Sequence, residues 1–425
     1  MIRKDFFTFQ IGYSYDLFFV LTFICGLPFS IKVSNIVLGI YVPYILYRIF
    51  QNKKAYVFNL QNFKRVASLP MLFLMFALSL FYSADRETGL SNIVDLLPLL
   101  IVPVLFCFIE LRTQDKKLIF WSFTVVNFLI VYINFIRAIA RSLHVISNKL
   151  VFDASVLGGY GFFESIVQGG NFFFYHEFSS ALHPTYWSFF LVFCLAFLSE
   201  EMGDCNLKKK YLIFGTFLIG ILACSSRIVL ISVPLLIAAY FVMTGKNNYT
   251  IIAVAAITIL CVLFALINPR FDSFFSLPNT LRLDAIRFQT WQSAIEVFKK
   301  NPFFGAGIGD ARTLLNDQYL QKGFLESYTY TYNEHNQYFQ IANSIGLIGL
   351  SIFLMSIGNG FVVALRGKNF LQFTFIFLTT LVCMVENFLD RRAGIIFFSV
   401  FYCLLFLHSV DQELKSKSRH HEDIN

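Results

Sequence analysis

Residues 342–365 read ANSIGLIGLSIFLMSIGNGFVVAL, an apolar run without a single Asp, Glu, Lys or Arg. A helix of this length crosses about 30 Å of hydrocarbon at about 1.5 Å per residue. Similar runs follow one another along the 425 residues, of which 57% are hydrophobic and 14% charged, against about 25% charged in an average soluble domain. Lipid accepts so much apolar surface, whereas a soluble core could not bury it. The sequence therefore predicts an all-α, polytopic membrane protein.

Short polar breaks separate the apolar runs, whose lengths predict about twelve membrane-spanning helices within residues 1–410. The polar residues 411–425 are expected to form a disordered cytoplasmic tail. The 54 Phe residues are interpreted as bulk that faces lipid. The expected spans are 15–31, 33–50, 69–84, 92–109, 118–138, 186–199, 211–225, 227–244, 250–267, 342–365, 370–388 and 393–410.

The positive charges indicate how the chain is oriented in the membrane. Cytoplasmic loops are rich in Lys and Arg, and an inside N-terminus places clusters such as Lys208, Lys209 and Lys210 on that side. Both ends of the chain are then inside. The net charge of +8 is explained by this bias, and without a basic face no nucleic-acid partner is expected. The short outer loops hold only Lys32, Arg86, Arg227, Arg391 and Arg392.

Two connections are too long to be simple loops, and both are expected on the outer side. They are residues 139–186 and 268–341, the latter inserted between the ninth and tenth spans. Loops of this length usually carry function. Within the second, residues 281–300 predict an amphipathic helix that lies against the membrane or the bundle and ends before Pro302. Its expected apolar side consists of Ile286, Trp291, Ala294, Ile295 and Phe298.

Several short motifs fall in these outer segments. Asn333-Glu334-His335-Asn336 leads directly into an apolar helix, and nine residues separate Asn336 from Gly346. Just upstream, residues 301–309 read NPFFGAGIG. Further elements are Ser226-Arg227 at the head of an apolar run, His183-Pro184-Thr185-Tyr186, and Glu386-Asn387-Phe388-Leu389-Asp390-Arg391.

The order and outer placement of these motifs resemble the O-antigen ligase and polymerase superfamily. The resemblance covers most of the chain in topology and residues 225–350 in motif detail. It implies an enzyme of the bacterial inner membrane whose active site faces the periplasm. It also implies that His335 is the catalytic base and that Arg227 and Arg287 hold a donor diphosphate. At Gly349 the chain departs from those ligases that carry Thr.

The residue types suit this chemistry. Transfer from a lipid diphosphate requires that the leaving diphosphate be neutralised and that an acceptor hydroxyl lose its proton. The planar guanidinium of Arg227 or Arg287 binds phosphate oxygens and stays charged where water is scarce. The imidazole of His335 accepts a proton near neutral pH, since its ordinary pKa is about 6.5.

Supporting roles are expected for Asn336, Asp390, His183 and Tyr186. Asp390 would orient an Arg or the catalytic His, or simply pair with a neighbouring Arg. His183 is read as a helix cap or a contact to the acceptor. The glycines of residues 305–309 are read first as a turn and second as a phosphate contact. Equivalent structural readings exist for Arg227 as an interface anchor and for Arg287 as a headgroup contact.

The resulting hypothesis is an inverting glycosyltransferase of the O-antigen ligase type, with no cofactor. It would move a glycan from undecaprenyl diphosphate to a lipid A–core sugar hydroxyl. Membrane lipids are expected to surround the protein. A polymerase or a protein O-glycosylating transferase with the same donor is the nearest alternative. No Asp-x-Asp pair lies in the outer loops and no Cys/His cluster occurs, so a metal-independent reaction is expected. A transporter of lipid-linked glycans is the alternative of another class, disfavoured because no internal repeat is found.

Overall fold

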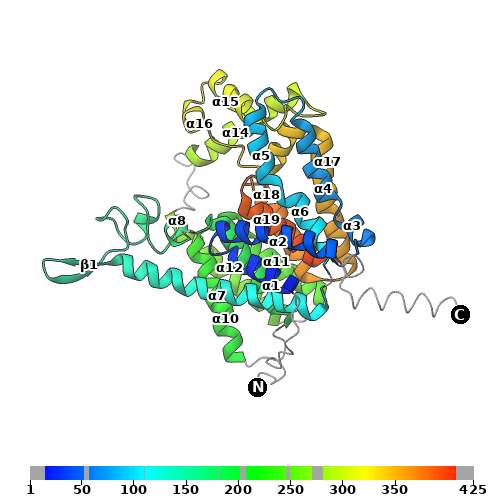
Figure 1. Ribbon diagram of the computed structural model, residues 1–425. Coiled ribbons are helices and arrows are strands. Elements are labelled where there is room, and N and C mark those ends of the chain that lie inside the picture. The colour runs from blue at the N-terminus through cyan, green and yellow to red at the C-terminus, as the bar shows by residue number, and fades with distance from the viewer. Residues whose placement is uncertain are drawn as a thin grey trace.

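The computed structural model describes residues 15–51, 57–109, 111–179, 181–201, 207–245, 249–269 and 281–407. These residues are almost entirely helical (Figure 1). The first helices are α1 (Tyr15–Gly26), α2 (Ile31–Gln51), α3 (Leu60–Val66), α4 (Ser68–Ser79), α5 (Arg86–Leu96), α6 (Pro98–Phe106) and α7 (Thr113–Ser142). The central ones are η2 (Glu164–Ile166), α8 (Tyr175–Phe178), α9 (Pro184–Glu201), α10 (Leu207–Cys224), α11 (Arg227–Thr244) and α12 (Tyr249–Ile267). The last are α14 (Leu281–Lys300), α15 (Ala311–Gln321), α16 (Leu325–Thr329), α17 (Gln337–Arg366), α18 (Phe370–Cys383) and α19 (Arg392–Phe406).

The predicted helical membrane architecture agrees with this arrangement at a coarse level. Among the described residues, five helical segments are long and apolar enough to cross a membrane, and several shorter apolar helices accompany them. The long segments are Ile31–Gln51, Arg86–Phe106, Thr113–Ser142, Arg227–Thr244 and Gln337–Arg366. The count of about twelve spans remains a prediction, although every expected span overlaps a helix. The expected tail, residues 411–425, lies outside the described residues.

Several expected spans differ from the observed helices, and two of these differences affect the site or its neighbourhood. The run 92–109 is divided at Leu97 into α5 and α6, where Pro98 has no N–H to continue the hydrogen-bond ladder. The run 370–388 ends as a helix at Cys383, and residues 384–391 form turns that carry several of the candidate site residues. The apolar side chains within 384–391 had made this stretch look like part of the span.

The first long loop contains the only strands among the described residues. Strands β1 (Leu143–Ile146) and β2 (Lys149–Phe152) pair antiparallel as a hairpin directly after α7. In Figure 1 this hairpin projects away from the helical body. The all-α prediction is therefore correct for the helical body and incomplete for this loop.

Aromatic packing in the centre of the bundle corrects the interpretation of Phe as lipid-facing bulk. Helices α9 and α19 are buried around nearly their whole circumference, and their phenyl rings pack on one another. The rings of Phe190 and Phe397, for example, stack with centroids 4.2 Å apart. Phe375 of α18 adds a ring to the same cluster. Part of the Phe content thus forms the core, because phenyl rings fill the space between closely packed helices.

A second, smaller core holds the helices of the second long loop together. Helices α14, α15 and α16 gather at one end of the molecule beside α5 and an end of α17 (Figure 1). Ala294 and Val297 of α14 are buried against Leu315 and Tyr319 of α15. Helix α14 also packs on α17. The loop is therefore a folded cap on the bundle.

Helix α17 is interrupted one third of the way along. Ile345 and Gly346 have non-helical backbone angles, and Gly346 has a φ of 67°. This region is left-handed and favours glycine. The interruption separates a short segment that begins at the site from the longer segment that runs on as an apolar helix.

Candidate functional site

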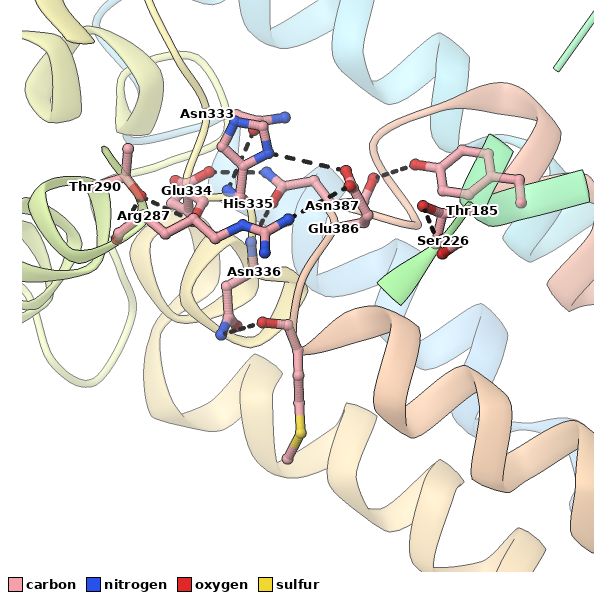
Figure 2. Close-up of polar contacts among 12 residues, drawn as sticks. Thr185, Ser226, Arg287, Thr290, Asn333, Glu334, His335, Asn336, Glu386 and Asn387 are labelled. Carbon is pink, nitrogen blue, oxygen red and sulfur yellow. Dashed lines mark hydrogen bonds and ion pairs between the residues drawn. The ribbon is translucent and has the colours of Figure 1, made fainter. Parts of the chain in front are cut away.

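Two segments far apart in the sequence form one polar unit at the start of α17. Asn336 donates its backbone N–H to Asn387 Oδ1 at 2.7 Å, and Asn387 Nδ2 donates to Glu334 Oε2 at 2.9 Å (Figure 2). Asn343 Nδ2 reaches the other oxygen of Glu334 at 3.4 Å. Because Glu334 and Asn387 are both 2% exposed, these bonds are made away from solvent and fix residues 333–336 against residues 384–391.

Further hydrogen bonds extend this attachment along α17. Leu389 donates its N–H to Gln337 Oε1 at 2.6 Å, and Gln340 Nε2 donates to Asp390 Oδ1 at 2.8 Å. Asn336 has a structural role: its Oδ1 accepts from the N–H groups of Tyr338 and Phe339 and so caps α17. The supporting residues Asn336 and Asp390 thus both join the start of α17 to the turn after α18.

His335 lies at the centre of this unit. Its Nδ1 is 3.8 Å from Glu386 Oε2, and its side chain is 31% exposed, so the imidazole is reachable from outside. The backbone of His335 has a φ of 46°, which is uncommon for a residue with a side chain. The Oδ1 of Asn333 accepts the N–H of His335 at 3.2 Å and supports this conformation. Such an unusual backbone angle agrees with a functional role for His335, because strained residues concentrate at functional sites.

Arg287 reaches the same carboxylate from the cap. Its Nη2 is 4.0 Å from Glu386 Oε1, so Glu386 lies between the guanidinium and the imidazole (Figure 2). Helix α14 is held there by Thr290, whose Oγ1 donates to the backbone oxygen of Glu334 at 3.2 Å. The expected helix 281–300 is therefore confirmed, and it brings Arg287 to His335.

The expected apolar side of α14 was only partly correct. Ile286 and Ala294 are buried as predicted, but Ile295 is 39% exposed. Two hydroxyl residues, Thr290 and Ser293, are buried in its place. The packed face is mixed because it faces the polar unit at the start of α17 as well as the small core of the cap.

Two neighbouring carboxyl groups are shifted in opposite directions. Burial raises the pKa of Glu334 above its ordinary value, and the hydrogen bond from Asn387 offsets this only in part. Burial acts in the same sense on Glu386, but the neighbouring imidazoles of His335 and His183 and the guanidinium of Arg287 outweigh it and lower the pKa of Glu386. Glu386 is therefore the ionised carboxylate of the site.

The starts of α9 and α11 lie on the other side of the turn after α18. Tyr186 OH donates to the backbone oxygen of Asn387 at 3.2 Å, and the charge of His183 acts on Glu386. Ser226 Oγ donates to Thr185 Oγ1 at 3.2 Å, which joins the start of α11 to that of α9. Arg227 is the first residue of α11, directly after Ser226. The structure thus brings His183 and Tyr186 to the unit and places Arg227 on the neighbouring helix start.

The glycine-rich stretch 305–309 is packed against the break in α17. Ala306 and Gly307 donate their N–H groups to Asn343 and Ser344 at 2.7 and 3.0 Å, and Leu347 donates to Pro302 at 2.8 Å. A Cβ on Gly305 would lie 2.5 Å from Ile345 N. These glycines permit close backbone approach, which confirms the turn reading. The alternative, contact with phosphate, is not supported because Ala306 and Gly307 already use their N–H groups.

Asp310 continues this junction to α4 and α5. Its two carboxylate oxygens accept the N–H groups of Ala84 and Asp85 at 2.7 and 2.9 Å. Ile308 and Gly309 donate to Ser79 and Ser83 at 3.1 and 3.2 Å. The stretch 302–310 therefore ties three helices together at the end of the molecule that carries the site.

Sequence reasoning did not assign roles to Glu386 and Asn387. Both were within a quoted motif, but only Asp390 was selected from it. A usable signal existed, because an ionisable residue inside an otherwise apolar run is costly and usually functional.

No cluster of three or more His, Cys, Asp or Glu side chains suited to a metal ion occurs in the part of the chain that the structure describes.

The apolar helices and the polar unit at their end define a multi-pass membrane protein with a candidate active site. A family model described as O-antigen ligase matches residues 212–354. This part of the chain is therefore similar to O-antigen ligases; the match covers Arg227, Arg287 and His335, whereas His183 and residues 384–391 lie outside it. Among curated proteins, no match was found.

Proposed function

We propose that this protein is a glycosyltransferase that moves a glycan from undecaprenyl diphosphate to a sugar hydroxyl. The observation that carries the proposal is the convergence of His335 and Arg287 on Glu386 in a chain whose residues 212–354 match the O-antigen ligase family model. This arrangement combines a group that accepts a proton with a group that binds phosphate. Both are required for transfer from a lipid diphosphate.

In the proposed reaction His335 is the general base. The acceptor hydroxyl attacks the anomeric carbon of the donor sugar and forms the new C–O bond, while its proton passes to the imidazole. The bond between the anomeric carbon and the diphosphate oxygen breaks, and undecaprenyl diphosphate leaves with the electron pair. Attack on the face opposite the leaving group inverts the anomeric centre. No metal is required, since guanidinium groups neutralise the leaving diphosphate.

The other candidate residues are assigned to binding and support. Arg287 and Arg227 bind the donor diphosphate, the latter from the start of α11. Asp390 accepts from Gln340 and is exposed, so it is placed to contact the acceptor sugar. Asn336 and Tyr186 hold the turn 384–391 in position, and His183 contributes positive charge beside Glu386. The site is proposed to face the periplasm from the bacterial inner membrane.

The decisive experiment compares two histidines. The His335→Ala variant is expected to lower glycan transfer by about 10²- to 10⁴-fold in reconstituted membranes, because it removes the general base. His144 on the projecting hairpin is exposed, so His144→Ala serves as the matched control with activity like that of the unaltered protein. Full transfer by the His335→Ala variant would refute the base assignment.

The acceptor is proposed to be a lipid A–core hydroxyl, and a second lipid-linked repeat unit would make the protein a polymerase instead. Surface glycans of a strain without this chain decide between these acceptors. Long, unattached lipid-linked polymer is expected for a missing ligase. Single repeat units attached to the core would assign the polymerase reaction.

A further inference from the structure

Glu386 contacts both groups that the proposed reaction uses. Its Oε2 faces His335 Nδ1 at 3.8 Å and its Oε1 faces Arg287 Nη2 at 4.0 Å. The Glu386 side chain is only 17% exposed, so little water screens these interactions. Neither separation is as short as the 2.7–2.9 Å, roughly, of a charge-assisted hydrogen bond. The carboxylate of Glu386 therefore lies near both the imidazole of His335 and the guanidinium of Arg287 without a close bond to either.

The geometry points to Glu386 as a positioning residue that couples occupancy of the donor site to the base. In the empty site Glu386 is shared between Arg287 and His335. When a diphosphate binds, Arg287 turns to its oxygens and Glu386 is left to His335 alone. This inference rests on the proposed function, because it assigns the diphosphate of that reaction to Arg287.

The Arg287 side of the exchange follows from charge and geometry. A diphosphate offers several anionic oxygens to a guanidinium fork, whereas Glu386 offers one oxygen at 4.0 Å. Arg287 is 35% exposed and lies on α14, so its side chain is accessible from the outer end of the site. The diphosphate therefore replaces the weaker partner, and the negative charge of Glu386 opposes its binding until that exchange occurs.

The His335 side follows from which nitrogen faces the carboxylate. Because Nδ1 faces Glu386, a proton on Nδ1 points at the carboxylate and leaves Nε2 to accept the proton of the acceptor hydroxyl. After the transfer the imidazole carries a positive charge, which a dedicated carboxylate stabilises. Release of Glu386 from Arg287 thus improves the base only when a donor is present.

The backbone of Glu386 is held in place by hydrogen bonds. Glu386 donates its N–H to Val382 at 2.9 Å and accepts the N–H of Phe388 at 2.9 Å. The next residue, Asn387, is fixed by Glu334 and Asn336. When a donor binds, we therefore expect side chains to move while the backbone of Glu386 stays in place. The titratable and charged groups that face it are His335, Arg287 of α14, His183 before α9 and Tyr186 of α9.

The test uses the full-length protein and two substitutions at one position. Glu386→Gln keeps the shape and removes the charge. We expect kcat to fall by about 10- to 100-fold, as for a misplaced catalytic group. We also expect KM for the lipid-linked donor to fall, and inorganic diphosphate to inhibit at about three- to tenfold lower concentration, because a competing negative charge is gone. The acidic limb of the pH–rate profile is expected to move to lower pH.

Glu386→Asp keeps the charge but withdraws it by one methylene. It is expected to retain the diphosphate inhibition of the unaltered protein and to show an intermediate kcat. Glu296→Gln removes a carboxylate that pairs with Lys299 on α14, away from the site, and is the matched control with unchanged kinetics. Thermal unfolding of each variant separates folding from function, and Glu386→Asp carries the test if Glu386→Gln does not fold.

Two results would overturn the inference. Unchanged kcat in Glu386→Gln would show that the base needs no carboxylate. A raised donor KM with weaker diphosphate inhibition would show that Glu386 supports the donor site instead of competing with it. In either case transfer would still depend on His335. By contrast, transfer that survives His335→Ala, or is absent from the unaltered protein, would reject the proposed function itself.

Discussion

Glu334 and Glu386 show how neighbouring carboxyl groups acquire different roles from their surroundings. Glu334 is buried among amide groups, and burial raises its pKa. For Glu386 the cost of burial is outweighed by the neighbouring side chains of His335, His183 and Arg287, so its pKa is lowered. The sequence places Glu334 in a polar stretch and Glu386 at the end of an apolar run, but it does not show which charged groups will face each of them. Their difference arises from segments that meet only after folding.

The opposite shifts predict opposite dependence of stability on pH. A carboxyl group whose pKa is lowered by folding stabilises the fold above its unfolded pKa of about 4.3, and this contribution is lost as the pH falls through the folded value. The thermal unfolding midpoint of the unaltered protein should therefore exceed that of Glu386→Gln at about pH 6, and the gap should close toward about pH 3. Unfolding in detergent, followed by tryptophan fluorescence, measures it.

The paired variant Glu334→Gln supplies the contrast. Because folding raises the pKa of Glu334, its stabilising contribution is complete below the unfolded value and is lost as the pH rises through the folded value. The thermal unfolding midpoint of the unaltered protein, measured relative to that of Glu334→Gln, should thus fall as the pH rises. Parallel curves for the two substitutions would contradict the assignment of the two environments.

Among the elements, α17 depends on its break. The apolar run 342–365 predicted an unbroken span, and composition alone could not reveal the interruption at Ile345 and Gly346. The reason lies in tertiary structure: residues 302–307 pair with the open backbone of the break. The spacing from Asn336 to Gly346 identified the glycine as part of a motif. Its physical role became apparent only from its contact with residues 302–307.

A single methyl group tests this role. A Cβ on Gly346 would lie 2.2 Å from the backbone oxygen of Phe303, and the φ of 67° disfavours any side chain. Gly346→Ala should therefore lower the free energy of unfolding by more than about 2 kcal/mol or prevent accumulation of folded protein. Expression level and thermal midpoint report both outcomes.

Gly358 is the matched position on the same helix. Apart from the backbone of its own helix, no atom lies within 4 Å of a Cβ placed there, so Gly358→Ala should be neutral or should stabilise by about 0.5–1 kcal/mol through helix propensity. Equal effects of the two alanines would mean that the contact between residues 302–307 and the break contributes little to folding.

At the scale of the whole molecule, periodicity and length predicted the helices well. Every expected span overlaps a helix, and 227–244 has the same bounds as α11. The candidate site was predicted less completely: the sequence suggested His335 from its motif and Arg287 from the helix 281–300, but it did not suggest the carboxylate of Glu386 that lies near both. The positions of the helices follow from compatibility with lipid, which is a local property of the chain. The composition of the candidate site follows from contacts between distant segments.

The orientation of the whole molecule is open to direct measurement. The Thr329→Cys variant adds one cysteine at an exposed position at the end of α16. This cysteine should react with a membrane-impermeant thiol reagent in intact spheroplasts. Gln61→Cys, exposed on α3, is expected in the cytoplasm and should react only after permeabilisation. The described native cysteines are buried or half-buried, so the parent protein gives the background. Labelling of Gln61→Cys with protection of Thr329→Cys would invert the topology and remove the site from the periplasm.

The hydrogen bonds between residues 333–340 and 384–391 also bear on the order of synthesis. A nascent chain that has emerged only as far as the end of α17 already carries its imidazole, yet the acid that faces it has not been translated. Insertion of α18 and the following turn completes the pair. Premature termination between these segments would therefore yield a polypeptide that carries His335 without Glu386, and we expect it to lack an assembled site.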